Sequence, residues 1–246
     1  LGAEVTLMGL VGNDESGDLL RGLLCESVNT LLTVDPSIKT TEKLRIIGRN
    51  QQIVRVDFEE KPSHAIDGPA LEQIENHEII IFSDYAKGVL SGIQALISYA
   101  KANGKTVLVD PKGYNYSKYS GSDLIKPNLD EMREMVGGWE NEHELRLKIS
   151  MIKKDVNLNA VLLTRAGDGM TLYHEGGATH IHSTAKEVYD VTGAGDTVMA
   201  ALGVALSEGR TLTEAATMAN YAAGIVVGKF GTATVTMKEI EEVMNG

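Results

Sequence analysis

Residues 189–202, YDVTGAGDTVMAAL, combine glycines with an acid in a way that could do chemistry. Gly193, Ala194 and Gly195 lead directly into Asp196, and a helical pattern of apolar residues follows. Glycines allow a tight turn and bring unpaired backbone N–H groups close to a ligand. Those donors, with the positive end of the helix dipole, favour negative charge on a transferred phosphoryl group. The turn is therefore a candidate phosphate site.

Asp196 itself needs an explanation, because a carboxylate repels phosphate. A side chain that accepts the proton of an attacking hydroxyl would supply one. The alternative is an ordinary acid in the first turn of a helix, which contributes less than about 1 kcal/mol through the helix dipole. The four residues GAGD leave both interpretations open.

Two common nucleotide motifs fail on the residues that let a backbone approach a ligand closely. Residues 103–106, NGKT, resemble the end of a P-loop, but that pattern requires glycine where the chain has Tyr99. A dinucleotide fingerprint that begins at Gly193 would need its third small residue at Val198. Neither a Walker-type NTPase nor a Rossmann dehydrogenase is indicated.

Strand and helix patterns alternate around this turn, which predicts an α/β fold: a mostly parallel sheet with helices on both faces. Thr211 and Glu214 have the spacing of a capping box at the start of a helix. The predicted strands cover 5–12, 78–85, 106–110 and 123–128, with a strand and hairpin over 159–177. The predicted helices cover 16–24, 91–105, 129–136, the segment from 196 to Gly209, and 212–227.

One segment, residues 30–60, breaks the alternation. It contains KLRIIGRNQQIVRVDFEE, which is rich in strand-forming residues and has no convincing helical pattern. We expect a single domain over residues 1–246, with this segment inserted as a small β flap. A decorated surface hairpin is the alternative.

The composition narrows the class of protein. A chain of 246 residues with 43% hydrophobic content can bury a full core, and a net charge of −11 argues against a nucleic-acid surface. No apolar run approaches the ~18 residues of a membrane span, and no signal-peptide pattern opens the chain. The single cysteine, Cys25, suggests a reducing cytoplasm and a small buried side chain. The six histidines lack the spacing of zinc ligands.

Several stretches together resemble the ribokinase-like (PfkB) carbohydrate kinases, in the expected order and over essentially all 246 residues. DVTGAGDT resembles the family signature, and LLTRAGDGM resembles its nucleotide-binding strand and turn. GLVGNDESG resembles an early G-x-D-x-x-G segment, with Gly12, Asp14 and Gly17. KPNLDE resembles the N-x-x-E motif, with Asn128 and Glu131.

Within the family, KLRIIGRNQQIVRVDFEE, SDYAKGVL and VDPKG look most like the members that phosphorylate D-glycero-β-D-manno-heptose 7-phosphate at its anomeric hydroxyl with ATP. The resemblance implies a 1,7-bisphosphate product, on the route to ADP-heptose and lipopolysaccharide. Bifunctional members continue into an adenylyltransferase domain, which we expect to be absent after Gly246. Members also carry an N-terminal strand and a Gly-Gly segment, which we expect to precede Leu1 and to be missing.

The resemblance also implies site residues, with ATP and Mg²⁺ as cofactors. Asp196 would be the catalytic base, and Gly193, Ala194 and Gly195 the anion hole. The residues expected around ATP are Asn128, Leu129, Asp130 and Glu131 at the phosphates, Thr164, Gly167 and Gly169 along the nucleotide, and Asn220 near the adenine. Glu131 would also help to place Mg²⁺ through water.

A net-acidic protein that handles two phosphorylated ligands needs local positive charge. Arg45, Arg49 and Arg55 in the flap, with Lys87 and Lys112, are the expected suppliers. Arginine suits a sugar phosphate because its planar fork bonds two oxygens at once. Each lysine follows a strand's carboxyl end, where open α/β sheets bind ligands. Surface salt bridges are the alternative for all of them.

Asp84 and Asp110 share those strand ends, where they could bond sugar hydroxyls or cap the next turn. Flap strands in this family often pair between subunits, so we also expect a homodimer formed through the flap. Two other functions stay open at this point: a kinase of the same family for another sugar or a nucleoside, and a nucleotide-binding fragment without catalysis.

Overall fold

The computed structural model describes residues 1–24, 28–48, 51–62, 65–185 and 187–245. Its chain divides into two compact units, which we treat separately. The sheet unit comprises Leu1–Ala3, Ile74–Tyr85 and Ile93–Gly246. The flap unit comprises Glu4–Gln73 and Ala86–Gly92.

The sheet unit contains a six-stranded sheet with the order β10-β9-β8-β7-β6-β5. The strands are β5 (Ile79–Ser83), β6 (Thr106–Asp110), β7 (Leu124–Ile125), β8 (Ala160–Thr164), β9 (Met170–His174) and β10 (Gly177–Ile181). Strands β5 to β8 pair in parallel, whereas β9 and β10 continue from β8 as antiparallel strands. The predicted hairpin over 159–177 is thereby confirmed.

β7 is much shorter than the predicted strand over 123–128, and proline explains where it stops. Lys126 still donates its backbone N–H to the carbonyl of Val109, at 2.9 Å. Pro127 has no N–H to donate, so the regular ladder is interrupted there, and an isolated bridge between Asn128 and Thr164 follows it. The chain then leaves the sheet at the edge where the candidate site residues gather.

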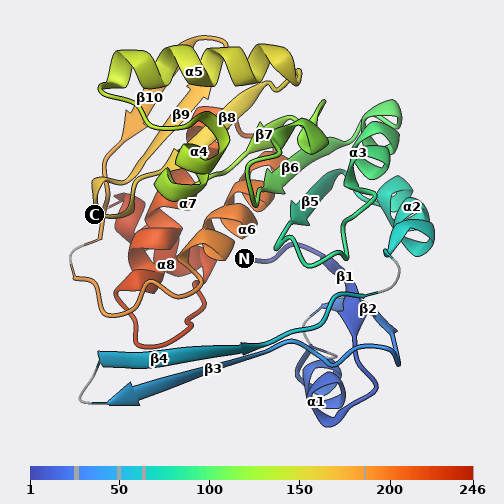
Figure 1. Ribbon diagram of the computed structural model, residues 1–246. Coiled ribbons are helices and arrows are strands. Elements are labelled where there is room, and N and C mark those ends of the chain that lie inside the picture. The colour runs from blue at the N-terminus through green and yellow to red at the C-terminus, as the bar shows by residue number, and fades with distance from the viewer. Residues whose placement is uncertain (25–27, 49–50, 63–64, 186, 246) are drawn as a thin grey trace. The chain divides into compact units, whose positions relative to one another are not determined.

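Helices cover both faces of the sheet (Figure 1). One face carries α6 (Ala194–Ser207), α7 (Leu212–Val227) and α8 (Met237–Asn245). The other carries α3 (Ile93–Ala102), α4 (Leu129–Val136) and α5 (Glu142–Asp155). Alternate strand residues serve the two layers: Leu108 packs in the core with α6 and α7, while Val107 and Val109 point to the opposite face.

The helices around the glycine turn confirm the local sequence signals. Thr211 and Glu214 form the predicted capping box at the start of α7, with a 2.9 Å bond from the Thr211 N–H to Glu214 Oε2. α6 lies so close to β5 that a methyl group added at Gly203 would be 2.9 Å from Cδ1 of Ile81. α5 and α8 are additional to the predicted helices.

The flap unit contains two small sheets. β1 (Thr6–Val11) pairs in parallel with β2 (Asn29–Val34), and α1 (Glu15–Leu24) connects them. β3 (Glu42–Gly48) and β4 (Gln51–Phe58) form an antiparallel hairpin. Most of the expected flap over 30–60 is therefore strand. Its first strand, β2, pairs with β1, which lies before residue 30.

α2 (Asp67–Asn76), also additional to the predicted helices, begins in the flap unit and ends in the sheet unit. Cys25 lies outside the described residues. Among the helices that the structure describes, none is long and apolar enough to cross a membrane.

Candidate active site

The site residues of the sheet unit gather at the carboxyl ends of its parallel strands. Asp84 follows β5, Asp110 ends β6, Asn128 follows β7 and Thr164 ends β8. Asn128 and Thr164 are joined directly by an isolated parallel bridge. The N-terminus of α6 reaches the same edge, because Tyr85 and Asp196 are hydrogen-bonded.

The turn before α6 has the conformation that its glycines allow. Gly193 is left-handed, with φ 81° and ψ −1°, and a methyl group there would lie 3.2 Å from Cγ2 of Thr232. The Ala194 N–H donates to the carbonyl of Val191 at 3.2 Å. The next N–H groups, those of Gly195 and Asp196, belong to the first turn, which has no acceptors inside the helix. This geometry favours an anion at the turn.

Asp196 stands exposed in the first turn of α6. The hydroxyl of Tyr85 donates a hydrogen bond to its Oδ1, at 3.2 Å. Burial, and then the neighbouring charge of Asp196, raise the pKa of Tyr85, so the phenol keeps its proton. The Asp196 carboxylate is thus held from one side and accessible to a ligand.

Lys126 is a site residue that the sequence predictions missed. It is only 4% exposed, and its Nζ lies 3.0 Å from Oδ1 of Asp110. A methyl group added at Gly195 would lie 3.3 Å from the same Nζ, so the ammonium adjoins the glycine turn. The reasoning applied to Lys87 and Lys112, a lysine just after a strand's carboxyl end, would have found it.

Asp110 sits in an acidic environment. Burial raises its pKa and the Lys126 ammonium lowers it, while the charges of Glu131 and Asp196 raise it further. These carboxylates therefore interact with one another across the strand ends. The Lys126 ammonium offsets part of this effect by favouring the ionised form of Asp110.

The N-x-x-E segment caps α4. Glu131 donates its backbone N–H to Oδ1 of Asn128 at 2.9 Å, and Asn128 returns its N–H to Oε2 of Glu131 at 3.0 Å. Lys112 Nζ lies 3.1 Å from Oε1 of Glu131. Leu129 is the first residue of α4, and Asp130 pairs with a surface arginine one turn on.

Asp84 is buried, and its hydrogen-bond network reaches the backbone of Lys112. Its Oδ2 accepts hydrogen bonds from Lys118 Nζ at 2.6 Å and from the Tyr119 hydroxyl at 2.8 Å. The same hydroxyl accepts the backbone N–H of Lys112, at 2.8 Å. Asp84 therefore fixes the chain that follows β6.

Two of the three residues predicted along the nucleotide lie in the turn between β8 and β9. Gly169 has φ 86°, and a methyl group there would lie 2.2 Å from the carbonyl oxygen of Ile181, so only glycine fits. Gly167, two residues earlier in the same turn, lines an open cavity of about 550 Å³ on the α5 side of the sheet. Asn220, predicted near the adenine, is buried and donates to the carbonyl of His182 at 2.8 Å. It ties α7 to the chain after β10.

The flap unit holds the remaining basic residues. Arg45 and Arg55 are direct cross-strand partners in the hairpin, and Arg55 Nε lies 3.1 Å from Oδ1 of Asp57. Lys87 pairs with Glu59. Arg49 lies outside the described residues.

The G-x-D-x-x-G segment forms a clamp within the flap unit. Asp14 Oδ1 accepts the Gly17 N–H at 2.9 Å and the Thr40 hydroxyl at 2.6 Å, and the hydroxyl accepts the Gly12 N–H at 2.9 Å. These bonds, led by that from the Thr40 hydroxyl, lower the pKa of Asp14. The motif fastens the start of α1 to the chain before β3.

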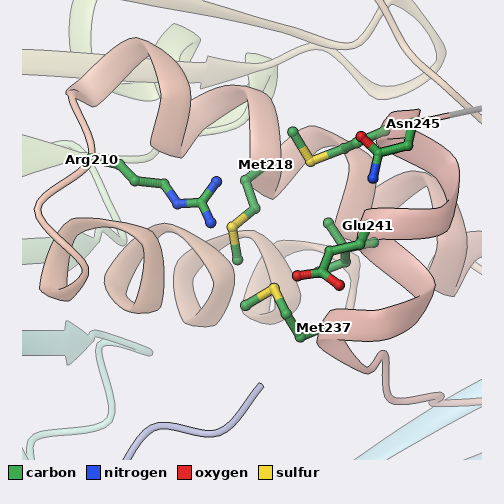
Figure 2. Close-up of a pocket in the computed structure, with 7 residues that line it drawn as sticks. Arg210, Met218, Met237, Glu241 and Asn245 are labelled. Atoms are coloured by element: carbon green, nitrogen blue, oxygen red, sulfur yellow. The ribbon is translucent and has the colours of Figure 1, made fainter.

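A second cavity, of about 170 Å³, lies between α7 and α8 (Figure 2). Its walls are mostly apolar, with Met218, Met237 and Met244, while Arg210 and Glu241 stand at its sides. It contains none of the predicted site residues and is separate from the candidate active site.

Comparison with known proteins gives a match over nearly the whole chain. Residues 1–239 match the family described as pfkB family carbohydrate kinase. The chain is 46% identical over 245 residues to the D-beta-D-heptose 7-phosphate kinase of Bordetella bronchiseptica, covering 98% of this chain and 78% of that protein. It is 44% identical to the bifunctional protein HldE of Nitrosococcus oceani, covering 100% of this chain and 53% of HldE. The chain thus spans about half the length of such bifunctional relatives.

Solved structures show the same fold. Ribokinase of Arabidopsis thaliana, complexed with ribose and ATP, superposes with a TM-score of 0.85 at 20% identity, covering 99% of this chain and 82% of that one. Phosphofructokinase-2 of Escherichia coli gives a TM-score of 0.82 at 20% identity, covering 100% and 82%. The predicted ribokinase-like α/β class is confirmed.

Proposed function

We propose that this chain, which belongs to the pfkB family of carbohydrate kinases, transfers the γ-phosphoryl group of ATP to the C1 hydroxyl of D-glycero-β-D-manno-heptose 7-phosphate. The product is the 1,7-bisphosphate, a precursor of ADP-heptose for the lipopolysaccharide core. The relative named D-beta-D-heptose 7-phosphate kinase, at 46% identity, and relatives named bifunctional protein HldE, at 41–44%, support this substrate. The observation that carries the proposal is the α6 turn, where backbone N–H groups adjoin an accessible carboxylate.

The chemistry follows from that turn. The C1 oxygen of the sugar attacks the γ-phosphorus, the bond to the β–γ bridging oxygen breaks, and Asp196 accepts the hydroxyl proton. The Ala194 N–H of the predicted anion hole is bonded to Val191, so the open N–H groups of the turn, those of Gly195 and Asp196, stabilise the charge on the transferred group. Phosphoryl transfer depends mostly on positioning and charge, so the placement of the starts of α4 and α6 at one sheet edge matters as much as the base.

Glu131 fits a water-mediated role towards Mg²⁺. Its two carboxylate oxygens already accept bonds from Lys112 and from the Asn128 N–H. Mg²⁺ keeps several of its waters and binds through phosphates and one or two carboxylates. Among the described residues no group of three or more acidic, histidine or cysteine side chains could hold a metal. When bound with ATP, Mg²⁺ neutralises phosphate charge.

The flap arginines are suited to the sugar phosphate. Arg45 and Arg55 lie directly opposite each other, so their side chains share one face of the hairpin. Like charges in that position destabilise a hairpin unless an anion lies between them. Asp57 offsets part of this repulsion at Arg55, and a phosphate that bridges both guanidinium groups would offset the rest, which supports a role in binding the 7-phosphate.

The test is sugar specificity. ADP release would be measured with ATP, Mg²⁺ and, in turn, the heptose 7-phosphate, the unphosphorylated heptose, ribose and fructose 6-phosphate. We expect turnover only with the heptose 7-phosphate. Equal turnover with ribose or fructose 6-phosphate would identify a different sugar kinase, and nucleotide binding without turnover would identify a binding protein.

The proposal includes a homodimer formed through the hairpin. One face of β3 and β4 carries Leu44, Ile46, Val54, Val56 and Phe58, each at least 37% exposed. A two-stranded hairpin is marginally stable alone, so its apolar face needs a cover. A second copy supplies an identical apolar face by two-fold symmetry.

A further inference from the structure

Lys126 is a buried cation that the mechanism above does not use. It follows β7 directly and is 4% exposed, with its Nζ 3.0 Å from Oδ1 of Asp110. The same Nζ would be 3.3 Å from a methyl group added at Gly195. The ammonium thus lies between a strand-end carboxylate and the turn that begins α6.

Stability alone does not account for this lysine. Removing an ammonium and a carboxylate from water is costly, and apolar side chains of similar volume often stabilise a fold equally well. The ammonium also adjoins the N-terminus of α6, where the helix dipole already favours negative charge. The Lys126 ammonium and the positive end of the α6 dipole repel each other unless an anion lies beside them. Asp110 supplies that negative charge in the free protein.

The other charged groups around Asp110 favour an exchange in which Lys126 leaves Asp110 for an incoming anion. Glu131 and Asp196 act electrostatically on Asp110 and disfavour its charge. Lys112 is engaged by Glu131, at 3.1 Å. Lys126 thus adjoins both Asp110 and the glycine turn.

We propose that Lys126 binds the transferring phosphoryl group. This step rests on the proposed kinase function and deepens it. As the phosphate arrives at the α6 turn, the Lys126 ammonium turns from Asp110 to a γ-phosphate oxygen and stays protonated throughout. It forms no covalent bond; the proton of the sugar hydroxyl still goes to Asp196. Together with the backbone N–H groups, the ammonium neutralises the charge on the phosphoryl oxygens.

The competing explanation is that Lys126 only holds Asp110 in place. In that case its loss would disturb sugar binding through Asp110 and would not distinguish nucleotides by their γ-phosphate. ADP lacks the group that Lys126 is proposed to bind. Comparing ATP-like and ADP binding therefore separates the two explanations.

The experiment measures the dissociation constants of ADP and of an ATP analogue with an imido group between its β and γ phosphates, both with Mg²⁺. The variants are Lys126→Met and the double change Lys126→Met with Asp110→Asn, which leaves no unpaired carboxylate. We expect both variants to weaken analogue binding by about ten- to hundredfold, as for one charge-assisted hydrogen bond. ADP binding should change less than about threefold.

Lys101→Met is the matched control. Lys101 pairs with Asp123 at 2.6 Å, just before β7, at the opposite end of the same strand. This control should leave both dissociation constants unchanged. Equal weakening of analogue and ADP in the Lys126→Met variants, or no change in either, would overturn the proposal.

A second measurement needs no variant. In a structure of the unmodified protein with the imido analogue, Nζ of Lys126 should lie about 3 Å from a γ-phosphate oxygen. A Nζ that remains on Asp110, beyond hydrogen-bond reach of the phosphate, would refute the exchange. Neither readout involves the sugar, so each stays decisive even if the chain fails to phosphorylate the heptose.

Discussion

At the scale of single residues, the acids at the strand ends differ in their partners. Asp110 pairs with Lys126, and Glu131 pairs with Lys112. Asp196 instead accepts a hydrogen bond from the neutral hydroxyl of Tyr85. Asp196 also differs in being exposed at the start of α6, beside the glycine turn. Its exposure and its neutral partner support the role of base proposed for it.

Asp196→Asn should lower kcat by about 10²- to 10⁴-fold, because the amide cannot accept the proton. The KM for ATP should hardly change, since the nucleotide is held by the turn and by α4. Steady-state kinetics measure both constants. Glu208→Gln, at the other end of α6, is the control and should retain normal kcat. A normal kcat in Asp196→Asn would remove this residue from the mechanism.

At the scale of elements, paired side chains fix the starts of three helices, of which α4 carries site residues. Asn128 with Glu131 caps α4, and Thr211 with Glu214 caps α7. α8 begins in the same way: the backbone N–H of Thr236 donates to Glu239 at 2.8 Å. Such caps satisfy N–H groups that a helix leaves open, so each acid stabilises its helix while it is ionised.

Glu239 makes the stability of α8 dependent on pH. A bond from Lys229, and then bonds from Thr236, lower the pKa of Glu239 to about 2. Since the folded pKa lies below the usual 4.5, the stabilisation is present above pH 4.5 and is lost as the pH falls towards 2. Glu239→Gln should therefore lower Tm at pH 6 more than at pH 3.

Thermal unfolding of both proteins at the two pH values measures this difference. Glu242→Gln is the control, because Glu242 lies on the exposed side of the same helix. Its Tm should match the unmodified protein at both values. An equal loss of Tm at pH 6 and pH 3 in Glu239→Gln would show that the cap does not depend on the charge.

Gly169→Ala should destabilise the turn between β8 and β9. The backbone there has φ 86°, and the added methyl would collide with the carbonyl of Ile181. We expect the free energy of unfolding to fall by more than about 1 kcal/mol. Gly167→Ala, which meets nothing within 4 Å, should change it by less than about 1 kcal/mol. Urea denaturation measures both, and equal effects would contradict the clash.

Much of the fold could be predicted from local sequence, because apolar runs and capping pairs act over a few residues. α5 was missed although Leu145, Ile149 and Ile152 form its buried stripe, since charged residues dominate the rest of that helix. The pairing of Asp84 with Lys118 could not be predicted, because they are 34 positions apart and meet only through the fold. The glycine turn could be predicted from the sequence, whereas the Lys126 ammonium beside it was not predicted.

At the scale of the whole molecule, the chain combines the sheet unit, which has a large hydrophobic core, with the flap unit, which has a small one. The sheet unit buries side chains from most of its strands and helices, including Leu108, Leu162 and Leu202. In the hairpin of the flap unit, apolar side chains such as Leu44 and Phe58 are about half exposed. The flap unit is therefore the part that benefits most from a partner.

Leu44→Glu should dissociate the proposed homodimer, because it places a charge on the apolar face of the hairpin. Sedimentation equilibrium at micromolar concentration should change from the mass of two chains to that of one. Lys43→Gln changes the opposite, charged face and should keep the dimer. If the unmodified protein already sediments as one chain, the dimer proposal is wrong.

The closeness of α6 to β5 has a consequence for evolution of the site. Gly203 lies two turns beyond Asp196 and meets Ile81 with no room for a methyl group. A side chain at this position would first displace the end of Ile81, and a bulky one would press α6 away from β5 together with Asp196 and the glycine turn. The residue at position 203 must therefore stay small for α6 to keep its distance from β5.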